Sequence, residues 1–201
     1  MQKRAEKTRT RILSAASGLF SEKGLNGATV DEIAALAEVN KQRIYAYFGS
    51  KNGLFEAVLL DVFERAELFS RDTVAEAEKN PRDLTAILVR GFLKVHAAHP
   101  QLWRLLAWAN LEGPHCTDAL NQARRKENEQ LRLIFERAVR NGQMRPVRFE
   151  LWLYTLFAVT CFRYSNELTI SHTLGTSPAD RHFEQQLADE LNRLFAPEKD
   201  K

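Results

Sequence analysis

Polar side chains of several kinds gather between residues 41 and 47, on a stretch of barely two helical turns. They are Lys41, Gln42, Arg43, Tyr45 and Tyr47. Cations and hydroxyl groups suit phosphate oxygens, and amide, guanidinium and hydroxyl groups also suit base edges. This combination predicts contact with DNA. The alternative is an ordinary solvated face on a small helical subdomain.

Two capped helices are predicted to hold this stretch in place. Thr29 is an N-cap candidate, and Glu32 stands three residues later, where it completes a capping box. Asn40 is predicted to cap the second helix alone, because Arg43 stands where a capping box needs Glu or Gln. Two short helices joined by a tight break form a helix-turn-helix, whose second helix enters the major groove.

The next helix is predicted to begin at Ser50, a further N-cap candidate. Lys51 would then lie in its first turn, where free backbone N–H groups favour a phosphate. Ile44 and Phe48 are four residues apart on the second motif helix, and we expect both to be buried.

The first quarter of the chain contains the successive stretches RTRILSAASGLFSEKG, LNGATVDEIAALAEV and NKQRIYAYFGSKNGLFEAVL. Together they resemble the TetR family of transcriptional regulators. The resemblance implies an all-α fold, with an N-terminal three-helix DNA-binding domain at residues 1–51 and a helical effector-binding and dimerisation domain at residues 52–201. One departure is the polar stretch from Asn40 to Arg43, where many members carry small residues, so the preferred DNA sequence cannot be read.

The resemblance further implies a regulator, most often a repressor, that binds a palindromic operator of double-stranded DNA as a homodimer and responds to a small molecule. We expect contacts to base edges from Lys41, Gln42, Arg43 and Tyr45, and contacts to phosphates from Thr29, Tyr47 and Lys51. The alternative function is a DNA-binding protein that is constitutive or controlled by a protein partner, with no small-molecule effector.

The positive charge of the chain is concentrated near its amino end. The net charge is only +3, but residues 1–52 hold nine Lys and Arg against five Asp and Glu, which gives +4 there and −1 over the remainder. Cations of this kind neutralise phosphates and supply most non-specific affinity for DNA. A basic tail kept for solubility would account for Lys3, Arg4 and Lys7, but not for the cations between Lys41 and Lys51.

Composition predicts a globular cytoplasmic protein. Hydrophobic residues make up 44% of the chain, enough for a core. No run of about 18 apolar residues is present, and no apolar segment follows the basic start, so neither a membrane span nor a signal peptide is expected. Cys116 and Cys161 form no CxxC motif, and we expect both to be reduced thiols.

Apolar periodicity predicts about nine helices and almost no strand. The first ends at Gly24. The fourth is predicted to run from Ser50 to about Glu78 and to touch both halves of the protein, so that a shift of its far end would move the DNA-binding end. The later helices are expected over about 81–98, 100–112, 117–141, 148–171 and 178–197.

The last two predicted helices carry dense apolar faces. By resemblance, such a pair packs against its copy as a four-helix bundle. The residues expected at this dimer interface are Leu153, Thr160, Tyr164, Phe183, Leu187 and Leu191. The alternative is that both faces are used up in the core of the single chain.

An effector pocket is expected between the fourth helix and this pair. Its candidate residues are Phe92, His96, Trp103, Trp108, Phe157, Cys161 and Arg163. Aromatic residues at helical spacing are more often plain core, which is the alternative for each of them. Arg163 could pair with an anionic effector or, instead, with Glu167 four residues on.

No metal, cofactor or enzymatic activity is expected. His96 and His99 lie three residues apart and His115 adjoins Cys116, but no third ligand follows at the spacing of a structural metal site. The sequence contains no GxSxG, HExxH or P-loop motif. Neither thiol has a resolving partner nearby in sequence, which argues against a redox switch.

Overall fold

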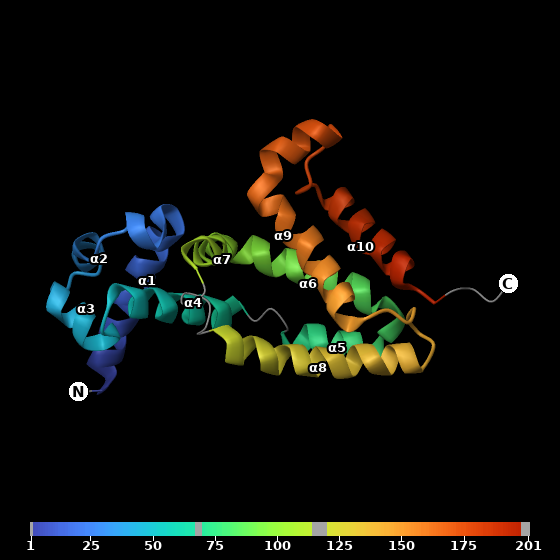
Figure 1. Cartoon of the computed structure of the whole chain (residues 1–201), viewed down its shortest axis with the longest axis horizontal. Helices are drawn as coiled ribbons and strands as arrows, with labels where there is room; N and C mark the ends of the chain where they lie inside the picture. The colour runs from blue at the N-terminus through green and yellow to red at the C-terminus, as the bar shows by residue number, and fades with distance from the viewer. Residues whose placement is uncertain (1, 67–69, 114–119, 198–201) are drawn as a thin grey trace. The chain divides into compact units, whose positions relative to one another are not determined.

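The computed structural model describes residues 2–66, 70–113 and 120–197, and these residues form ten α-helices and one 3₁₀ helix (Figure 1). The prediction of an all-α fold is confirmed. The elements are α1 (Gln2–Gly27), α2 (Val30–Leu36), α3 (Lys41–Phe48), α4 (Lys51–Ala66), α5 (Arg71–Lys79), η1 (Pro81–Asp83), α6 (Leu84–Ala98), α7 (Pro100–Glu112), α8 (Asn121–Arg140), α9 (Phe149–Leu174) and α10 (Arg181–Phe195). Within the described part of the chain, no helix is both long enough and apolar enough to cross a membrane.

The chain forms two compact units that are interleaved in sequence. The first consists of α1 to α4 together with α7, and the second of α5, η1, α6, α9, α10 and most of α8. The functional boundary expected after residue 51 stays a prediction, because these units are defined by packing alone.

The first unit is built around α1, which packs against α2, α4 and α7. Its apolar stripe places Ile12, Ala16 and Phe20 in the core, all fully buried. The Phe20 ring meets the Phe55 ring of α4 edge to face, with 5.1 Å between their centroids. α1 packs against α2, and its Ala5 carbonyl accepts a hydrogen bond from Tyr47 of α3. It therefore fixes the position of both helices relative to the rest of the unit.

A kink at Gly24 interrupts α1 where the first helix was predicted to end. Gly24 has φ 70°, in the left-handed region that favours glycine, and a short helical segment continues to Gly27. The indole of Trp108, on α7, lies directly against this position, so a Cβ built on Gly24 would come within 2.6 Å of a ring carbon.

The prediction of one long helix over residues 50–78 is wrong, because α4 ends at Ala66 in the first unit and α5 begins at Arg71 in the second. The Ser70 hydroxyl caps α5 by accepting a hydrogen bond from the Thr73 amide at 3.2 Å. Ser70 was therefore the local signal for a new helix. Residues 67–69, which the predicted helix included, lie outside the described residues.

The start of the last helix also differs from the prediction. It begins at Arg181 rather than near Pro178, because the Asp180 carboxylate accepts hydrogen bonds from the amides of His182 and Phe183 at 2.8 and 3.1 Å. The Ser177 hydroxyl instead accepts from the Ala179 amide at 3.1 Å, in the turn that precedes the helix. The helix before it, α9, runs on to Leu174 and ends at Gly175.

The second unit is centred on α6, which packs against α5, α9 and α10. Trp152 on α9 is fully buried, and its indole N–H donates to the Thr85 hydroxyl of α6 at 3.1 Å. The Phe135 ring of α8 lies 4.7 Å from the Trp152 ring. Asn192 on α10 accepts from the Ala86 amide at 3.3 Å, so polar contacts as well as apolar ones join α6 to its neighbours.

Candidate nucleic-acid interface

The helix-turn-helix is held by the two predicted caps. The Thr29 hydroxyl accepts from the Glu32 amide at 3.2 Å, and the Glu32 carboxylate accepts from the Thr29 amide at 2.9 Å, which completes the capping box. Asn40 accepts from the Arg43 amide at 2.9 Å and acts alone, as expected. Lys23 and Thr29 lower the pKa of the Glu32 carboxyl to about 2, so this carboxylate stays ionised. The caps therefore fix where each motif helix begins.

The turn between the two helices contains a backbone feature that sequence reasoning missed. Glu38 has φ 52°, a left-handed conformation that costs a non-glycine residue about 1–2 kcal/mol. Its carboxylate pairs with the Arg11 guanidinium of α1 at 3.3 Å. The tight turn sets α3 against α2, and Ile44 of α3 is fully buried beneath it.

The outer face of α3 presents the residues expected to read bases. Lys41, Gln42, Arg43 and Tyr45 are all exposed. A hollow of about 430 Å³ lies on this face and is lined by Asn40, Gln42, Arg43, Ala46 and Tyr47. An exposed helix bearing an amide, a guanidinium and phenols can enter a major groove and donate hydrogen bonds to base edges.

Lys41 already has a partner within the protein. Its ammonium lies 2.9 Å from the Asp31 carboxylate on α2, and this hydrogen bond raises the pKa of Lys41. The other two hydrogens of the ammonium group leave it able to donate elsewhere as well. Asp31 was not anticipated as a neighbour, because this contact depends on how α2 and α3 pack against each other.

The three residues expected to contact phosphates also have internal partners. The Lys51 ammonium donates to the Asn26 carbonyl at 3.5 Å, and the Tyr47 hydroxyl donates to the Ala5 carbonyl at 3.2 Å. The Thr29 hydroxyl donates to the Glu32 carboxylate at 2.8 Å. A hydroxyl group has one hydrogen, and in this structure Thr29 and Tyr47 both donate it within the protein. The Lys51 ammonium has three hydrogens, and two of them remain available to other acceptors. The phosphate roles stay predictions.

Phe48, expected to be buried, is only half-buried. The guanidinium carbon of Arg9 lies 5.6 Å from the centroid of its ring. The sequence did not link Arg9 to α3. Arg9 follows Ala5 by four residues and so shares a helix face with it, and Ala5 is the residue that accepts a hydrogen bond from Tyr47 of α3.

The expected effector residues fall into both units. Phe92 and Phe157 stack with 4.9 Å between their ring centroids, and Cys161 lies beside His96 with 3.4 Å between its sulfur and Nε2. Trp103 and Trp108 lie on α7 in the other unit, where Trp108 packs on Gly24. The second unit therefore brings together Phe92, His96, Phe157, Cys161 and Arg163, but not the two tryptophans.

His96 is the buried polar group of this cluster. It is only 2% exposed, and its Nδ1 has no hydrogen-bond partner among the described residues. Burial, followed by the nearby Arg163 charge, lowers the pKa of His96 to about 4, so the imidazole is neutral near pH 7. The region around His96 thus combines stacked rings with an unsatisfied nitrogen, the composition that small-molecule sites use.

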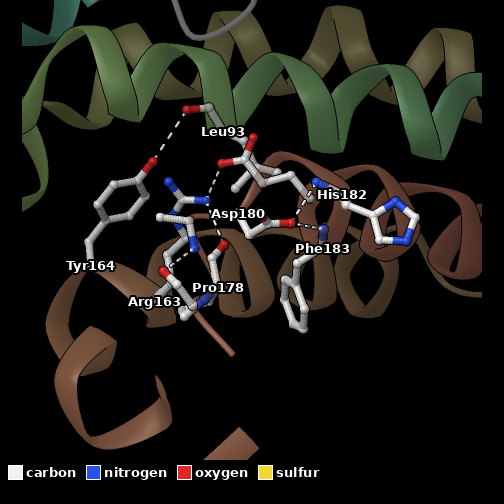
Figure 2. A network of polar contacts seen from close by, with 10 residues as sticks. Leu93, Arg163, Tyr164, Pro178, Asp180, His182 and Phe183 are labelled. Carbon is white, nitrogen blue, oxygen red and sulfur yellow. Dashed lines mark hydrogen bonds and ion pairs between the residues drawn. The ribbon is translucent and has the colours of Figure 1, made fainter. Parts of the chain in front are cut away.

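Arg163 pairs with Glu184 of α10, not with Glu167 as one sequence alternative held (Figure 2). It also donates to the Pro178 carbonyl at 3.0 Å. The neighbouring Tyr164 donates to the Leu93 carbonyl of α6 at 3.3 Å, and burial raises the pKa of its phenol. Together these contacts fasten the middle of α9 to α6 and to the start of α10.

No group of three or more His, Cys, Asp or Glu residues suited to a metal occurs in the part of the chain that the structure describes. His115 and Cys116 lie outside that part. Cys161 is a thiol, and its sulfur lies beside His96.

The residues expected at a dimer interface are buried or half-buried in the single chain, whereas interface residues should be exposed before the two copies meet. Leu153, Thr160 and Leu191 lie in the core of the second unit, and Tyr164, Phe183 and Leu187 are half-buried. For Leu153, Thr160 and Leu191 this burial favours the alternative of a core role in the single chain, and the dimer interface itself stays a prediction. The exposed apolar side chains of α9 are instead Leu151, Tyr154, Phe162, Leu168 and Leu174.

Comparison with protein families matches about four fifths of the chain. Residues 12–58 match the model for bacterial regulatory proteins of the tetR family, and residues 81–193 match that for a tetracyclin repressor-like C-terminal domain. The HTH-type transcriptional repressor NicS of Pseudomonas putida is 34% identical over 185 residues, which span 88% of this chain and 85% of NicS. The HTH-type transcriptional repressor SCO4008 of Streptomyces coelicolor is 41% identical over 143 residues, 71% of this chain and 68% of that protein.

Solved structures share the same fold. The putative transcriptional regulator SCO4942 of Streptomyces coelicolor superposes with a TM-score of 0.71 at 25% identity, over 95% of this chain and 99% of that one. A TetR family transcription regulator of Marinobacter aquaeolei superposes with a TM-score of 0.76 at 17% identity, over 98% of this chain and 100% of that one. At the latter identity, the likeness concerns the fold alone.

Proposed function

The chain belongs to the TetR family of bacterial regulatory proteins, and we propose that it is a repressor that binds a near-palindromic DNA operator as a homodimer and responds to a small molecule. As a family member it is a DNA-binding transcriptional regulator and not an enzyme. Two relatives are named as repressors, which supports that direction of control. We place its action in the cytoplasm, where bacterial DNA lies.

The exposed polar face of α3 carries the proposal. Lys41, Gln42, Arg43 and Tyr45 approach base edges, and the caps at Thr29 and Asn40 keep the two motif helices in register. Thr29, Tyr47 and Lys51 lie on the phosphate side of the interface, where Lys51 still has two N–H hydrogens to donate directly, whereas the Thr29 and Tyr47 hydroxyl groups donate their hydrogens within the protein. A two-fold dimer would place two such helices about 34–36 Å apart, one turn of DNA.

The exposed apolar face of α9 supports dimerisation. Leu151, Tyr154 and Phe162 follow helical spacing and are 59%, 73% and 53% exposed. Apolar side chains grouped in this way mark protein–protein contacts. The face is opposite to the buried Leu153 and Thr160, so the dimer uses different residues of α9 from those that pack on α6.

The cluster around His96 is the proposed effector site. A neutral imidazole beside stacked rings suits an uncharged or amphipathic molecule, whereas Arg163 is already paired with Glu184. For a near-complete switch, the molecule must prefer one state of the protein by about 5 kcal/mol.

Selection of binding sites from a random DNA pool tests the DNA side of the proposal. We expect enrichment of a near-palindrome whose half-sites lie about one helical turn apart. Failure to enrich any sequence, at low salt and without added small molecules, would contradict the proposal.

A matched pair of variants then tests α3. Arg43→Ala should weaken binding to the selected site by about 1–3 kcal/mol and relax the preference at one base pair. Arg71→Ala removes an exposed cation from α5 and should leave binding unchanged. Equal losses on selected and mixed-sequence DNA would show that Arg43 does not read a base.

Oligomeric state and ligand response are tested separately. Phe162→Lys should convert the dimer to a monomer in sedimentation, and Leu133→Lys, on the exposed side of α8, should not. A thermal-shift screen of small molecules distinguishes the effector-controlled repressor from a constitutive DNA-binding protein. A true effector at about 100 times its dissociation constant adds roughly 2.7 kcal/mol of stability. A screen without hits, with operator binding intact, would favour the constitutive alternative.

A further inference from the structure

We propose that the first two turns of α1 are part of the DNA interface, with Lys3, Arg4 and Lys7 neutralising phosphates beside the groove that α3 enters. This inference rests on the proposed DNA binding, and it changes the interpretation of these three cations, which a solubility tail would otherwise explain.

The cations belong to an ordered helix. The α1 helix begins at Gln2, and Lys3, Arg4 and Lys7 are all exposed on it. Thr8, in the same turns, is buried, and its hydroxyl donates to the Arg4 carbonyl at 3.0 Å. A cation on a fixed helix loses less conformational entropy on binding than one on a flexible tail.

Two contacts fasten these turns to α3, within the same compact unit (Figure 1). The Tyr47 hydroxyl donates to the Ala5 carbonyl at 3.2 Å, and Arg9 lies over the Phe48 ring at 5.6 Å. Lys3, Arg4 and Lys7 each lie within two residues of Ala5, or about 3 Å along the helix axis. The backbone of these turns is therefore held next to the end of the recognition helix, and the exposed cations extend from it.

The local charge favours a polyanion. Between Lys3 and Arg11 the chain carries five cations and a single carboxylate, Glu6. Arg11 is paired with Glu38 and Arg9 faces a ring, whereas Lys3, Arg4 and Lys7 form no ion pair with another described residue. Because α3 is adjacent, the polyanion that fits both surfaces together is one DNA duplex, contacted in a groove by α3 and along its backbone by α1.

The same geometry assigns Tyr47 a positioning role. Its one hydroxyl hydrogen is donated to Ala5, so the group that joins α1 to α3 cannot at the same time donate to a phosphate. In this interpretation Tyr47 acts on DNA through the cations that it holds in place.

The test compares two triple variants with the same loss of charge. The first is Lys3→Gln, Arg4→Gln and Lys7→Gln, and the control is Lys79→Gln, Arg82→Gln and Lys94→Gln, three exposed cations of the second unit. Binding to a mixed-sequence duplex is measured across a salt series. Each lost phosphate contact lowers the slope of log affinity against log salt by about 0.9, so the first variant should lose up to about 2.7 and the control none.

The outcomes separate this inference from the function on which it rests. If the wild-type protein binds the duplex and the first variant keeps the slope of the control, α1 makes no phosphate contact and the inference is wrong. If the wild-type protein binds no DNA at all, the proposed function fails with it. Far-ultraviolet circular dichroism checks that the helical content of both variants is unchanged.

A double-mutant cycle tests the role of Tyr47. Tyr47→Phe should weaken binding about threefold in the wild-type background, the scale of one lost hydrogen bond, and should have no further effect in the variant without the three cations. An equal loss in both backgrounds would mean that the hydroxyl contacts DNA directly, and would overturn the positioning role.

Discussion

The caps of the first unit join residues three apart, at Thr29 with Glu32, Asn40 with Arg43 and Ser50 with Gly53, and all lie at the surface. The polar contacts inside the second unit join distant residues. The Trp152 indole and Thr85 are 67 residues apart, His96 and Cys161 are 65 apart, and Tyr164 and Leu93 are 71 apart. The caps of the first unit are local contacts at the surface, whereas the second unit also contains buried or half-buried polar contacts that hold distant helices together.

This difference separates two kinds of sensitivity. A surface cap exchanges a hydrogen bond with water when it is lost, so its removal costs little. A buried donor or acceptor that loses its partner bears the full cost of desolvation. We therefore expect single substitutions of polar groups to affect stability more in the second unit, while the exposed face of the first remains available to DNA.

The largest expected effect is an exception that lies in the first unit and involves no polar group. Gly24→Ala adds a Cβ at φ 70° that would lie 2.6 Å from the Trp108 indole. Strain and overpacking together should lower the free energy of unfolding by about 3 kcal/mol. Urea denaturation measures it. Gly18→Ala is the control, since nothing lies within 4 Å of that position, and it should stabilise the helix by up to about 1 kcal/mol. If both variants changed the free energy of unfolding equally, the backbone conformation at Gly24 would not be important for stability.

The second effect is a pH dependence that His96 confers on the second unit. The pKa of His96 is about 4 in the folded protein, against its ordinary value of 6.5. Between about pH 6.5 and pH 4, His96 is therefore protonated in the unfolded chain but neutral in the folded one. Stability is therefore highest above about pH 6.5 and falls as the pH drops towards 4, by about 2 kcal/mol between about pH 7 and pH 5. His96→Gln should flatten this dependence, as measured by urea denaturation at both pH values.

His172→Gln is the matched control for this pH dependence, because His172 is exposed on the same helix as Cys161. It should retain the full fall in stability. If both variants behave like the wild-type protein, acid destabilisation comes from groups other than His96.

The third effect tests the buried contact between α6 and α9. Thr85→Val leaves the indole N–H of the fully buried Trp152 without its partner, which should cost about 1–3 kcal/mol. Thr155→Val serves as its control, since the Thr155 hydroxyl only bonds to the Leu151 carbonyl of its own exposed helix face. A similar small cost for both variants would show that the buried polar contacts of the second unit are no more sensitive than surface ones.

The same contrast explains what could be predicted from the sequence. The caps at Thr29, Asn40 and Ser50 were identified because a cap depends on residues three positions apart, and the recognition face of α3 followed from them. The partners of His96, Arg163 and Trp152 could not be identified, because they depend on how α6, α9 and α10 pack. Trp108 was placed among the effector residues because the sequence does not reveal which helix it packs on. The structure shows that it packs on Gly24 of α1.

The smallest expected effect tests the surface side of the comparison. Thr29→Ala removes the hydroxyl that accepts from the Glu32 amide and should cost about 1 kcal/mol of stability, the usual value of an N-cap. Thr29→Ser keeps the cap and should restore it. The same pair addresses DNA binding, because a hydroxyl that donates to Glu32 has no hydrogen left for a phosphate. If Thr29 acts only through the cap, Thr29→Ser binds DNA like the wild-type protein, and Thr29→Ala loses only the affinity that follows from a less ordered α2. A loss of DNA binding in Thr29→Ala without any change in stability would instead mean that the hydroxyl leaves Glu32 for the DNA backbone when the complex forms.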